Sequence, residues 1–197
     1  MEEKKSLNKK WMSVTLAMTL GLSLTTSSIS FAKKKDDWKG NLVIAGGALG
    51  SSNKEIYNEF ISLAGGKKKA KIGIIPAASS SLKSSQSFKK DLITYGLNEH
   101  QIEIVPLANQ DFSGTPEDES KWRKNANSKR IANKIENYSA IWFVGGDQLR
   151  ITDTLVKPNG HRTKALDAIW KMYKEGGVLG GTSAGAAIMS DVMITGG

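Results

Sequence analysis

The stretch Ala140-Ile141-Trp142-Phe143-Val144-Gly145-Gly146-Asp147-Gln148-Leu149 decides the fold. Five consecutive apolar residues end at two glycines, a pattern typical of a buried strand followed by a tight turn. Three other short apolar runs end at glycine or proline, at 42–47, 71–76 and 178–181. Strands that are apolar throughout are buried on both faces, which is the environment of a parallel sheet.

Helical patterns separate these strands. Asn53 can cap a helix whose apolar residues recur at helical spacing and which Gly65-Gly66 ends. The remaining pattern predicts helices over 84–95, 127–137, 149–155, 163–175 and 184–189, a strand over 102–107 and a long exposed loop over 108–124. Strands that alternate with helices predict an α/β fold with a parallel, doubly wound sheet, forming one domain over residues 41–197.

Composition excludes several classes of protein. The chain has 197 residues, no cysteine and a formal charge of +9. Without cysteine there is no disulfide, zinc–thiolate site or cysteine nucleophile, and no cofactor or metal is expected. The lysine runs 33–35 and 67–69 lack interleaved aromatic residues, so they indicate solvated surface charge rather than a nucleic-acid site. Adhesion to an anionic cell surface is a secondary reading of this charge.

The first 32 residues have the pattern of a signal peptide. Four lysines precede an apolar run over 11–24, and Ser30-Phe31-Ala32 places small residues at the −3 and −1 positions of a cleavage site. The apolar run is short for a membrane-spanning helix, which needs about 20 residues. Cleavage after Ala32 is expected to give a secreted, periplasmic or cell-surface protein that begins with a flexible arm, 33–40.

Gly181-Thr182-Ser183-Ala184-Gly185 carries the chemistry that the sequence indicates. This G-x-S-x-G pattern lies between a strand and a helix, which is the context of a nucleophile elbow. The sharp turn exposes the Ser183 hydroxyl, and the flanking glycines let the backbone pass closely. The Ala184 N–H then lies at a helix N-terminus, where it can donate to an oxyanion.

Gly145-Gly146-Asp147-Gln148 follows the preceding strand at the same edge of the sheet, where ligands bind in open α/β folds. Glycines there expose backbone N–H groups, and Asp147 or Gln148 can reach a substrate. A tight turn followed by an Asp147 helix cap is the alternative interpretation.

The segments 142–149 and 180–187 together closely resemble cyanophycinases, which belong to the serine peptidase family that also contains the aspartyl dipeptidases. Residues 43–47 and 74–78 resemble the first two strands of that family. The resemblance implies a flavodoxin-like α/β/α sandwich related to class I glutamine amidotransferases. It also implies hydrolysis of cyanophycin, a polypeptide substrate, to β-Asp-Arg dipeptides. Ser183 would be the nucleophile, Gly146 and Ala184 the oxyanion donors, and Gln148 a substrate-binding residue.

The sequence departs from this family in one respect. The family's general-base histidine follows the serine, whereas His100 and His161 both precede Ser183, and the chain ends 14 residues after it. We therefore expect the amino-terminal part of a catalytic domain that is inactive alone, with apolar surface partly exposed around Val178, Leu179, Ile188 and Met193. A complementary C-terminal chain and a homodimer both stay open as partners.

Three alternatives remain. A related aspartyl-dipeptidase-like hydrolase would use the same elbow. A non-catalytic secreted binding module is favoured by the missing histidine and the basic surface. An α/β-hydrolase esterase also uses G-x-S-x-G, but the sequence has no HGGG-type oxyanion loop.

Overall fold

A computed structural model describes residues 38–195 and contains one parallel sheet of five strands. The strand order is β1-β5-β4-β2-β3, and every pairing between neighbours is parallel. The strands are β1 (Asn41–Ala45), β2 (Ile72–Ile75), β3 (Ile102–Ile104), β4 (Ala140–Phe143) and β5 (Val178–Thr182). This arrangement confirms the predicted doubly wound α/β class.

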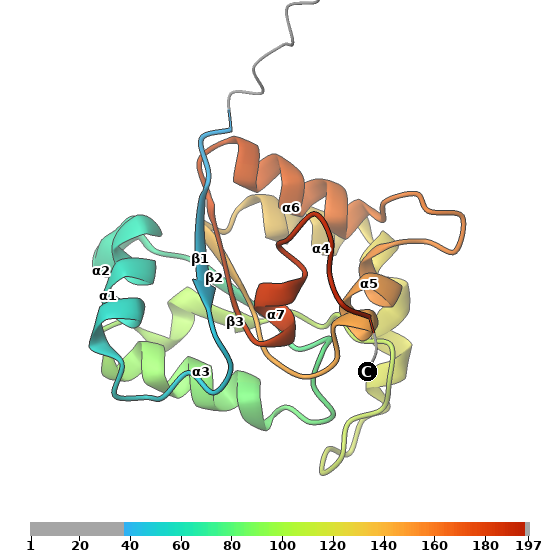
Figure 1. Ribbon diagram of the computed structural model, residues 1–197, viewed down its shortest axis with the longest axis horizontal. Coiled ribbons are helices and arrows are strands. Elements are labelled where there is room, and N and C mark those ends of the chain that lie inside the picture. Colours follow the sequence, from blue (N-terminus) through green and yellow to red (C-terminus); the bar gives the residue numbers. More distant parts are fainter. Residues whose placement is uncertain (1–37, 196–197) are drawn as a thin grey trace, which may run out of the picture. The chain divides into compact units, whose positions relative to one another are not determined.

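Helices cover both faces of the sheet (Figure 1). One face packs against α1 (Lys54–Leu63) and α3 (Lys83–Thr94). The other packs against α4 (Lys129–Glu136), α5 (Gln148–Leu155), α6 (Lys164–Lys174) and α7 (Ala184–Ala187). The short elements are α2 (Gly66–Lys69), η1 (Glu99–Gln101) and η2 (Glu119–Asn127), none of which was expected from the sequence.

Strand β4 shows why a continuous apolar run suits the centre of this sheet. Successive side chains point to opposite faces of a strand. Trp142 therefore packs toward α1 and α3, while Ile141 and Phe143 pack toward the helices of the other face. The Trp142 ring stacks on Phe88, with 4.3 Å between centroids, and meets Phe60 edge-on at 5.1 Å. Each fully buried large side chain contributes about 1.5–3 kcal/mol, so this cluster holds α1 and α3 on the sheet.

Helix boundaries follow the predicted capping residues. The Asn53 side chain accepts a hydrogen bond from the Ile56 N–H at 3.3 Å, and Gly65 lies just beyond α1 with φ of +101°. The Thr163 hydroxyl accepts from the Leu166 N–H at the start of α6. The amino-acid sequence thus places both ends of α1 and the start of α6 correctly.

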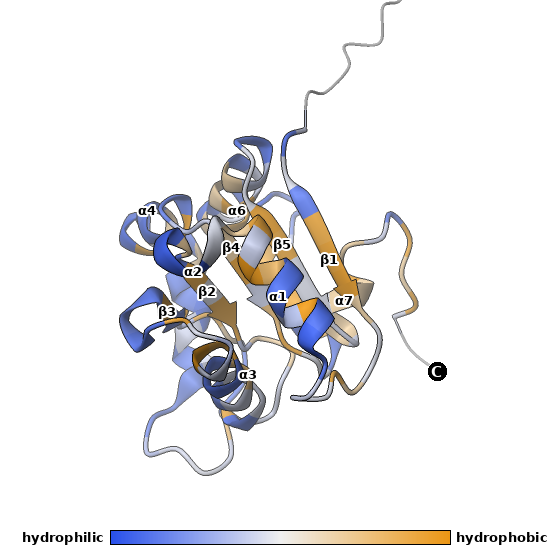
Figure 2. Ribbon diagram, turned by 90° about the vertical axis from the view of Figure 1, so that its left-hand side faces the viewer, coloured by the Kyte–Doolittle hydropathy of each residue, from blue (hydrophilic) through white to orange (hydrophobic). Residues whose placement is uncertain are grey.

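The prediction that strand β1 is buried is wrong. Its apolar run was expected to be buried, but β1 is an edge strand, and Leu42 and Ile44 are 44% and 57% exposed. Figure 2 shows this apolar strand at the edge of the sheet. Val178 and Leu179 were expected to be exposed and are buried, because β5 lies between β1 and β4 and α6 covers it.

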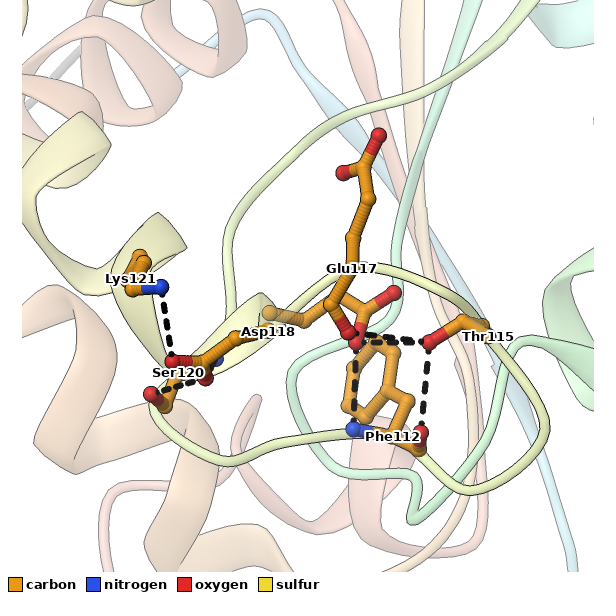
Figure 3. A network of polar contacts seen from close by, with 7 residues as sticks. Phe112, Thr115, Glu117, Asp118, Ser120 and Lys121 are labelled. Carbon is orange, nitrogen blue, oxygen red and sulfur yellow. Dashed lines mark hydrogen bonds and ion pairs between the residues drawn. The ribbon is translucent and has the colours of Figure 1, made fainter.

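Two further predictions, both for the segment 102–124, are wrong. Strand β3 ends at Ile104, before Pro106, although the apolar run continues to Leu107. The loop predicted to be exposed is anchored instead, because Glu119 is buried and accepts hydrogen bonds from the Thr115 hydroxyl at 2.9 Å and the Phe112 N–H at 3.2 Å. Figure 3 shows this polar network and the adjoining Asp118–Lys121 ion pair. Glu119 also begins η2, so residues 119–127 are helical.

The predicted signal peptide, 1–32, and most of the predicted arm, 33–40, lie outside the described residues. Where the description begins, Trp38 packs against α6, with 5.3 Å between its ring and that of Trp170. In the described range, none of the helices is both long and apolar enough to cross a membrane.

Candidate active site

Ser183 lies in a sharp turn between β5 and α7. Its φ of 52° and ψ of −118° lie outside the regions that non-glycine residues normally occupy. Such backbone strain costs about 1–3 kcal/mol and is concentrated at functional sites. The residue is exposed, whereas its neighbour Ala184 is buried. The turn therefore presents the serine at the surface, as the G-x-S-x-G pattern predicts.

The two glycines of the pattern are required by close backbone approaches. A Cβ on Gly181 would lie 2.3 Å from the Gly185 carbonyl oxygen. A Cβ on Gly185 would lie 2.1 Å from the Phe143 carbonyl oxygen. Both distances are far below van der Waals contact, so the elbow can pack against the end of β4 only when these positions lack side chains.

The Gly145-Gly146 segment lies directly beside the elbow. Because β4 pairs with β5 in parallel, with Phe143 opposite Gly181, the two strands end at the same edge. A Cβ on Gly145 would lie 3.1 Å from the Ser183 Cβ. Within the described residues, neither the Gly146 N–H nor the Ala184 N–H donates a backbone hydrogen bond. Both amides are therefore available to an oxygen bound near Ser183.

Asp147 and Gln148 are both engaged within the protein. The Asp147 carboxylate accepts from the Leu149 N–H at 2.9 Å and lies 3.7 Å from the Arg150 Nε, so it caps α5. The alternative interpretation of this residue, an N-cap, thus describes its observed contacts. The Gln148 side chain donates to the Ile194 carbonyl oxygen at 2.5 Å. Roles for either residue in substrate binding stay predictions.

A cavity of about 380 Å³ opens beside Ser183. Ser183, Thr182 and Gly145 form one side of it, and the remaining lining comes from the loop after β1, from α1, from α3 and from the end of β4. Sequence reasoning did not identify the residues of α1 and α3 as part of the site. The row Ser84, Ser87 and Asp91 at helical spacing on α3 was the available signal.

The polar centre of this cavity is Asp91. Its Oδ2 accepts hydrogen bonds from the Tyr57 hydroxyl at 2.7 Å and from the Ser51 hydroxyl at 3.0 Å. Burial, together with the hydrogen bond to the Asp91 carboxylate, raises the pKa of Tyr57 well above its ordinary value of 10.0. Tyr57 therefore stays protonated and acts only as a donor.

Neither histidine lies in this cavity, as the sequence interpretation expected. His100 belongs to η1, which precedes β3 at the opposite edge of the sheet, and His161 follows α5 in an exposed turn. No histidine is among the described residues that line the Ser183 cavity. The described residues also contain no cluster of three or more acidic or histidine side chains that could hold a metal ion.

Comparison with known proteins identifies the relatives of this site. Residues 119–197, which include β4 and the whole elbow, match the model of peptidase family S51. A cyanophycinase of Thermosynechococcus vestitus is 28% identical over 161 residues, which cover 81% of this chain and 44% of the relative. A cyanophycinase of Trichormus variabilis is 30% identical over 157 residues, which cover 79% and 46%. The resemblance to cyanophycinases that the sequence motifs indicate is confirmed.

The chain spans less than half the length of these curated cyanophycinases. A solved structure of a peptidase from an acI-B1 Actinobacterium superposes with a TM-score of 0.57 and is 22% identical. The superposition covers 80% of this chain and 59% of that structure, and it shows the shared fold. The S51 match begins at Glu119 and therefore includes the serine side of the cavity but not Tyr57 or Asp91.

Proposed function

We propose that this chain carries the nucleophile of a serine hydrolase of the cyanophycinase type. The observation that supports this most is the strained, exposed Ser183 between β5 and α7. The neighbouring Gly146 and Ala184 N–H groups, free of backbone partners in the described residues, add the second requirement of such a site.

In the proposed reaction the Ser183 oxygen attacks an amide carbonyl of the substrate. The Gly146 and Ala184 amides stabilise the oxyanion, the amine departs with a proton, and water then hydrolyses the acyl-enzyme. A serine hydroxyl is a poor nucleophile without a base. Because no described histidine lines the cavity, we propose that the base comes from outside the described residues or from a complementary chain.

The proposed substrate is a polypeptide of the cyanophycin type. This proposal is supported by the two curated relatives described above, both of which are named cyanophycinase. A dipeptide with an amino-terminal aspartate is the alternative for the same serine chemistry. A non-catalytic binding module is the second candidate, because no described histidine lies in the cavity.

Labelling by a fluorophosphonate tests the nucleophile directly. The reagent needs only a reactive serine, so it reports on Ser183 even where turnover of the polymer is slow. We expect labelling at Ser183, acceleration by added imidazole acting as a diffusible base, and complete loss in Ser183→Ala. Ser190→Ala, which changes an exposed serine outside the cavity, should label like the parent chain. Labelling that survives in Ser183→Ala, or none even with imidazole, would favour the binding module.

We further propose that the chain is exported and cleaved after Ala32. The support is the basic segment, the apolar run and the Ser30-Phe31-Ala32 site. Mass spectrometry of protein collected outside the cytoplasm should find Lys33 as the first residue. An intact Met1 in protein that stays in the cytoplasm would contradict export.

A further inference from the structure

Two neighbouring cavities lie near the amino ends of β2, β3 and β4. Their volumes are about 310 and 200 Å³, and Lys71, Glu103 and Tyr138 line both of them. Lys71 directly precedes β2, Glu103 lies in β3 and Tyr138 lies just before β4. Ser183 follows the carboxyl end of β5, which is parallel to these strands. The two cavities therefore lie at the edge of the sheet opposite to the elbow.

Positive charge dominates the lining of these cavities. It includes a single carboxylate, that of Glu103, and five lysine or arginine side chains. We call these five residues the basic surface: Lys68, Lys69, Lys71, Arg130 and Lys134. All of them are exposed except Lys134, which is half-buried. The lysine run 67–69 is thus part of a larger charged surface, which forms only when α2 and α4 come together beside β3.

Glu103 neutralises one cation of the basic surface. Its carboxylate accepts hydrogen bonds from the Lys134 Nζ at 2.5 Å and from the Tyr138 hydroxyl at 2.7 Å. Burial alone would raise the pKa of Glu103, but these hydrogen bonds and the nearby charge of Arg130 lower it below 4.5. Within the described residues, the other four cations form no ion pair. Like charges held close together repel one another, and a bound anion relieves this repulsion.

The backbone beneath the basic surface is held in place by buried and paired groups. The Gln101 side chain is buried, and its Nε2 donates to the carbonyl oxygens of Lys67 at 3.0 Å and Ala70 at 2.8 Å. The Lys71 N–H donates to the Ser139 hydroxyl at 2.9 Å, and the Lys71 carbonyl oxygen accepts from the Ser139 N–H at 2.8 Å. The lysines therefore project from a fixed backbone, which lowers the cost of ordering them around a ligand.

The lining of the cavities favours a phosphate polymer over a membrane or a nucleic acid. None of the exposed large apolar side chains of the described residues lines either cavity, so nothing there can insert among acyl chains. The lining has no tryptophan or phenylalanine, and the hydroxyl of its single tyrosine, Tyr138, is bound to Glu103. Bases therefore find no row of rings on which to stack. Phosphate oxygens, in contrast, accept several charge-assisted hydrogen bonds from guanidinium and ammonium groups that surround them.

We propose that the basic surface binds a flexible polymer of phosphate groups, with Lys71 and Arg130 as central contacts. Lys71 lines both cavities, and Arg130 is the guanidinium among the cations. The polymer carries neither bases nor acyl chains. Because the basic surface lies at the opposite edge of the sheet from Ser183, the chain can be retained on such a polymer while the Ser183 cavity stays open. This interaction is independent of the proposed hydrolase activity.

Calorimetric titration of the full chain with inorganic polyphosphate tests this proposal. Poly(glycerol phosphate), whose phosphates are further apart, is the second probe, and the tighter of the two identifies which spacing the surface fits. We expect the affinity to fall steeply as the salt concentration rises, because each phosphate contact releases counterions. Lys71→Gln combined with Arg130→Gln should weaken binding at least about tenfold and make the salt dependence shallower.

A matched double variant separates the basic surface from the overall charge of the chain. Lys54→Gln combined with Lys90→Gln removes the same charge from two exposed lysines of α1 and α3 outside both cavities, and it should bind like the parent. Melting curves confirm that each variant is folded. Ser183→Ala should also bind like the parent, so the result is readable even where the hydrolase assignment fails.

Three outcomes would overturn the proposal. The first is an equal loss of affinity in the two double variants, which would reduce the effect to net charge. The second is tighter binding of phosphatidylglycerol vesicles or of an oligothymidylate than of either phosphate polymer, which would assign the basic surface to a membrane or a nucleic acid. The third is no binding of either phosphate polymer at low salt.

Discussion

Ser183 combines two properties that a residue rarely has together. It occupies a strained backbone conformation, and it lies at the surface, where no tight packing of its own side chain explains the strain. The surrounding backbone enforces the turn, because Gly181 and Gly185 pack against carbonyl oxygens at distances that leave no room for Cβ atoms. The strain therefore belongs to the elbow as a whole and persists when the serine is replaced.

Replacement of Ser183 by glycine should stabilise the fold relative to replacement by alanine. Glycine adopts φ of +52° without a Cβ clash, which relieves about 1–3 kcal/mol of strain, while its greater freedom in the unfolded chain offsets part of this. We expect Ser183→Gly to exceed Ser183→Ala by about 1 kcal/mol in the free energy of unfolding, measured by urea titration. At Ser62, exposed in the last turn of α1, the order should reverse, because alanine has a higher helix propensity than glycine. The same order at both positions would refute strain at the elbow.

Among elements, the short helix α7 depends on its fit against β4. Gly185 lies inside α7, and a Cβ there would lie 2.1 Å from the Phe143 carbonyl oxygen, a backbone atom of a central strand. We expect Gly185→Ala to destabilise the fold by about 2–3 kcal/mol, since neither backbone can move freely. Gly47→Ala is the matched control, because nothing lies within 4 Å of its added Cβ, and it should stay within about 0.5 kcal/mol. Thermal melts of the two variants measure the difference, and equal melting temperatures would contradict it.

The segment between β3 and α4 depends on one buried carboxylate. Burial disfavours the charge of Glu119, but hydrogen bonds from the Thr115 hydroxyl and the Phe112 N–H outweigh this and lower its pKa below the ordinary value of 4.5. The ionised group therefore stabilises the fold above pH 4.5, and this contribution is lost as the pH falls through the lowered pKa. We expect Glu119→Gln to be less stable than the parent at neutral pH and to lose less stability on acidification. Glu117→Gln, at an exposed position of the same loop, should follow the parent curve in chemical denaturation at each pH.

Most elements were predicted correctly because residues close together in the sequence determine where a strand or helix begins and ends. Apolar runs ended by glycine or proline gave β2, β4 and β5, and capping residues gave α1 and α6. The anchored segment around Glu119 was missed because its polar composition resembles an exposed loop, and only tertiary contacts bury the carboxylate. An edge strand and a central strand can have the same apolar residue pattern, so β1 was expected to be buried.

At the scale of the whole molecule, the site joins segments that are distant in the sequence. The elbow and the Gly145-Gly146 turn were predictable from motifs because each is continuous. The opposite wall was not, because Ser51, Tyr57 and Asp91 meet only when α1 and α3 pack on the same face of the sheet. These distant segments meet because the parallel topology brings the ends of β1, β4 and β5 to one edge of the sheet.

The same topology leaves β1 at an edge of the sheet that the described residues form, with no partner strand among them on its outer side. Leu42 and Ile44 alternate along it with 44% and 57% exposure, and Val192 and Ile194 are exposed at 88% and 79%. An exposed apolar edge strand offers unpaired backbone groups and apolar side chains to a second chain, which makes it a site of self-association. We expect the mass of the chain, measured by light scattering during gel filtration, to rise with protein concentration.

Ile44→Lys should suppress this rise, because a charge on an edge strand opposes pairing with another edge. Ile93→Lys is the matched control, since it places the same charge at a 40%-exposed isoleucine on α3, away from β1. If the two variants associate alike, the association does not involve β1. If the parent chain stays monomeric at all concentrations, the exposed edge of β1 does not drive self-association and the prediction is wrong.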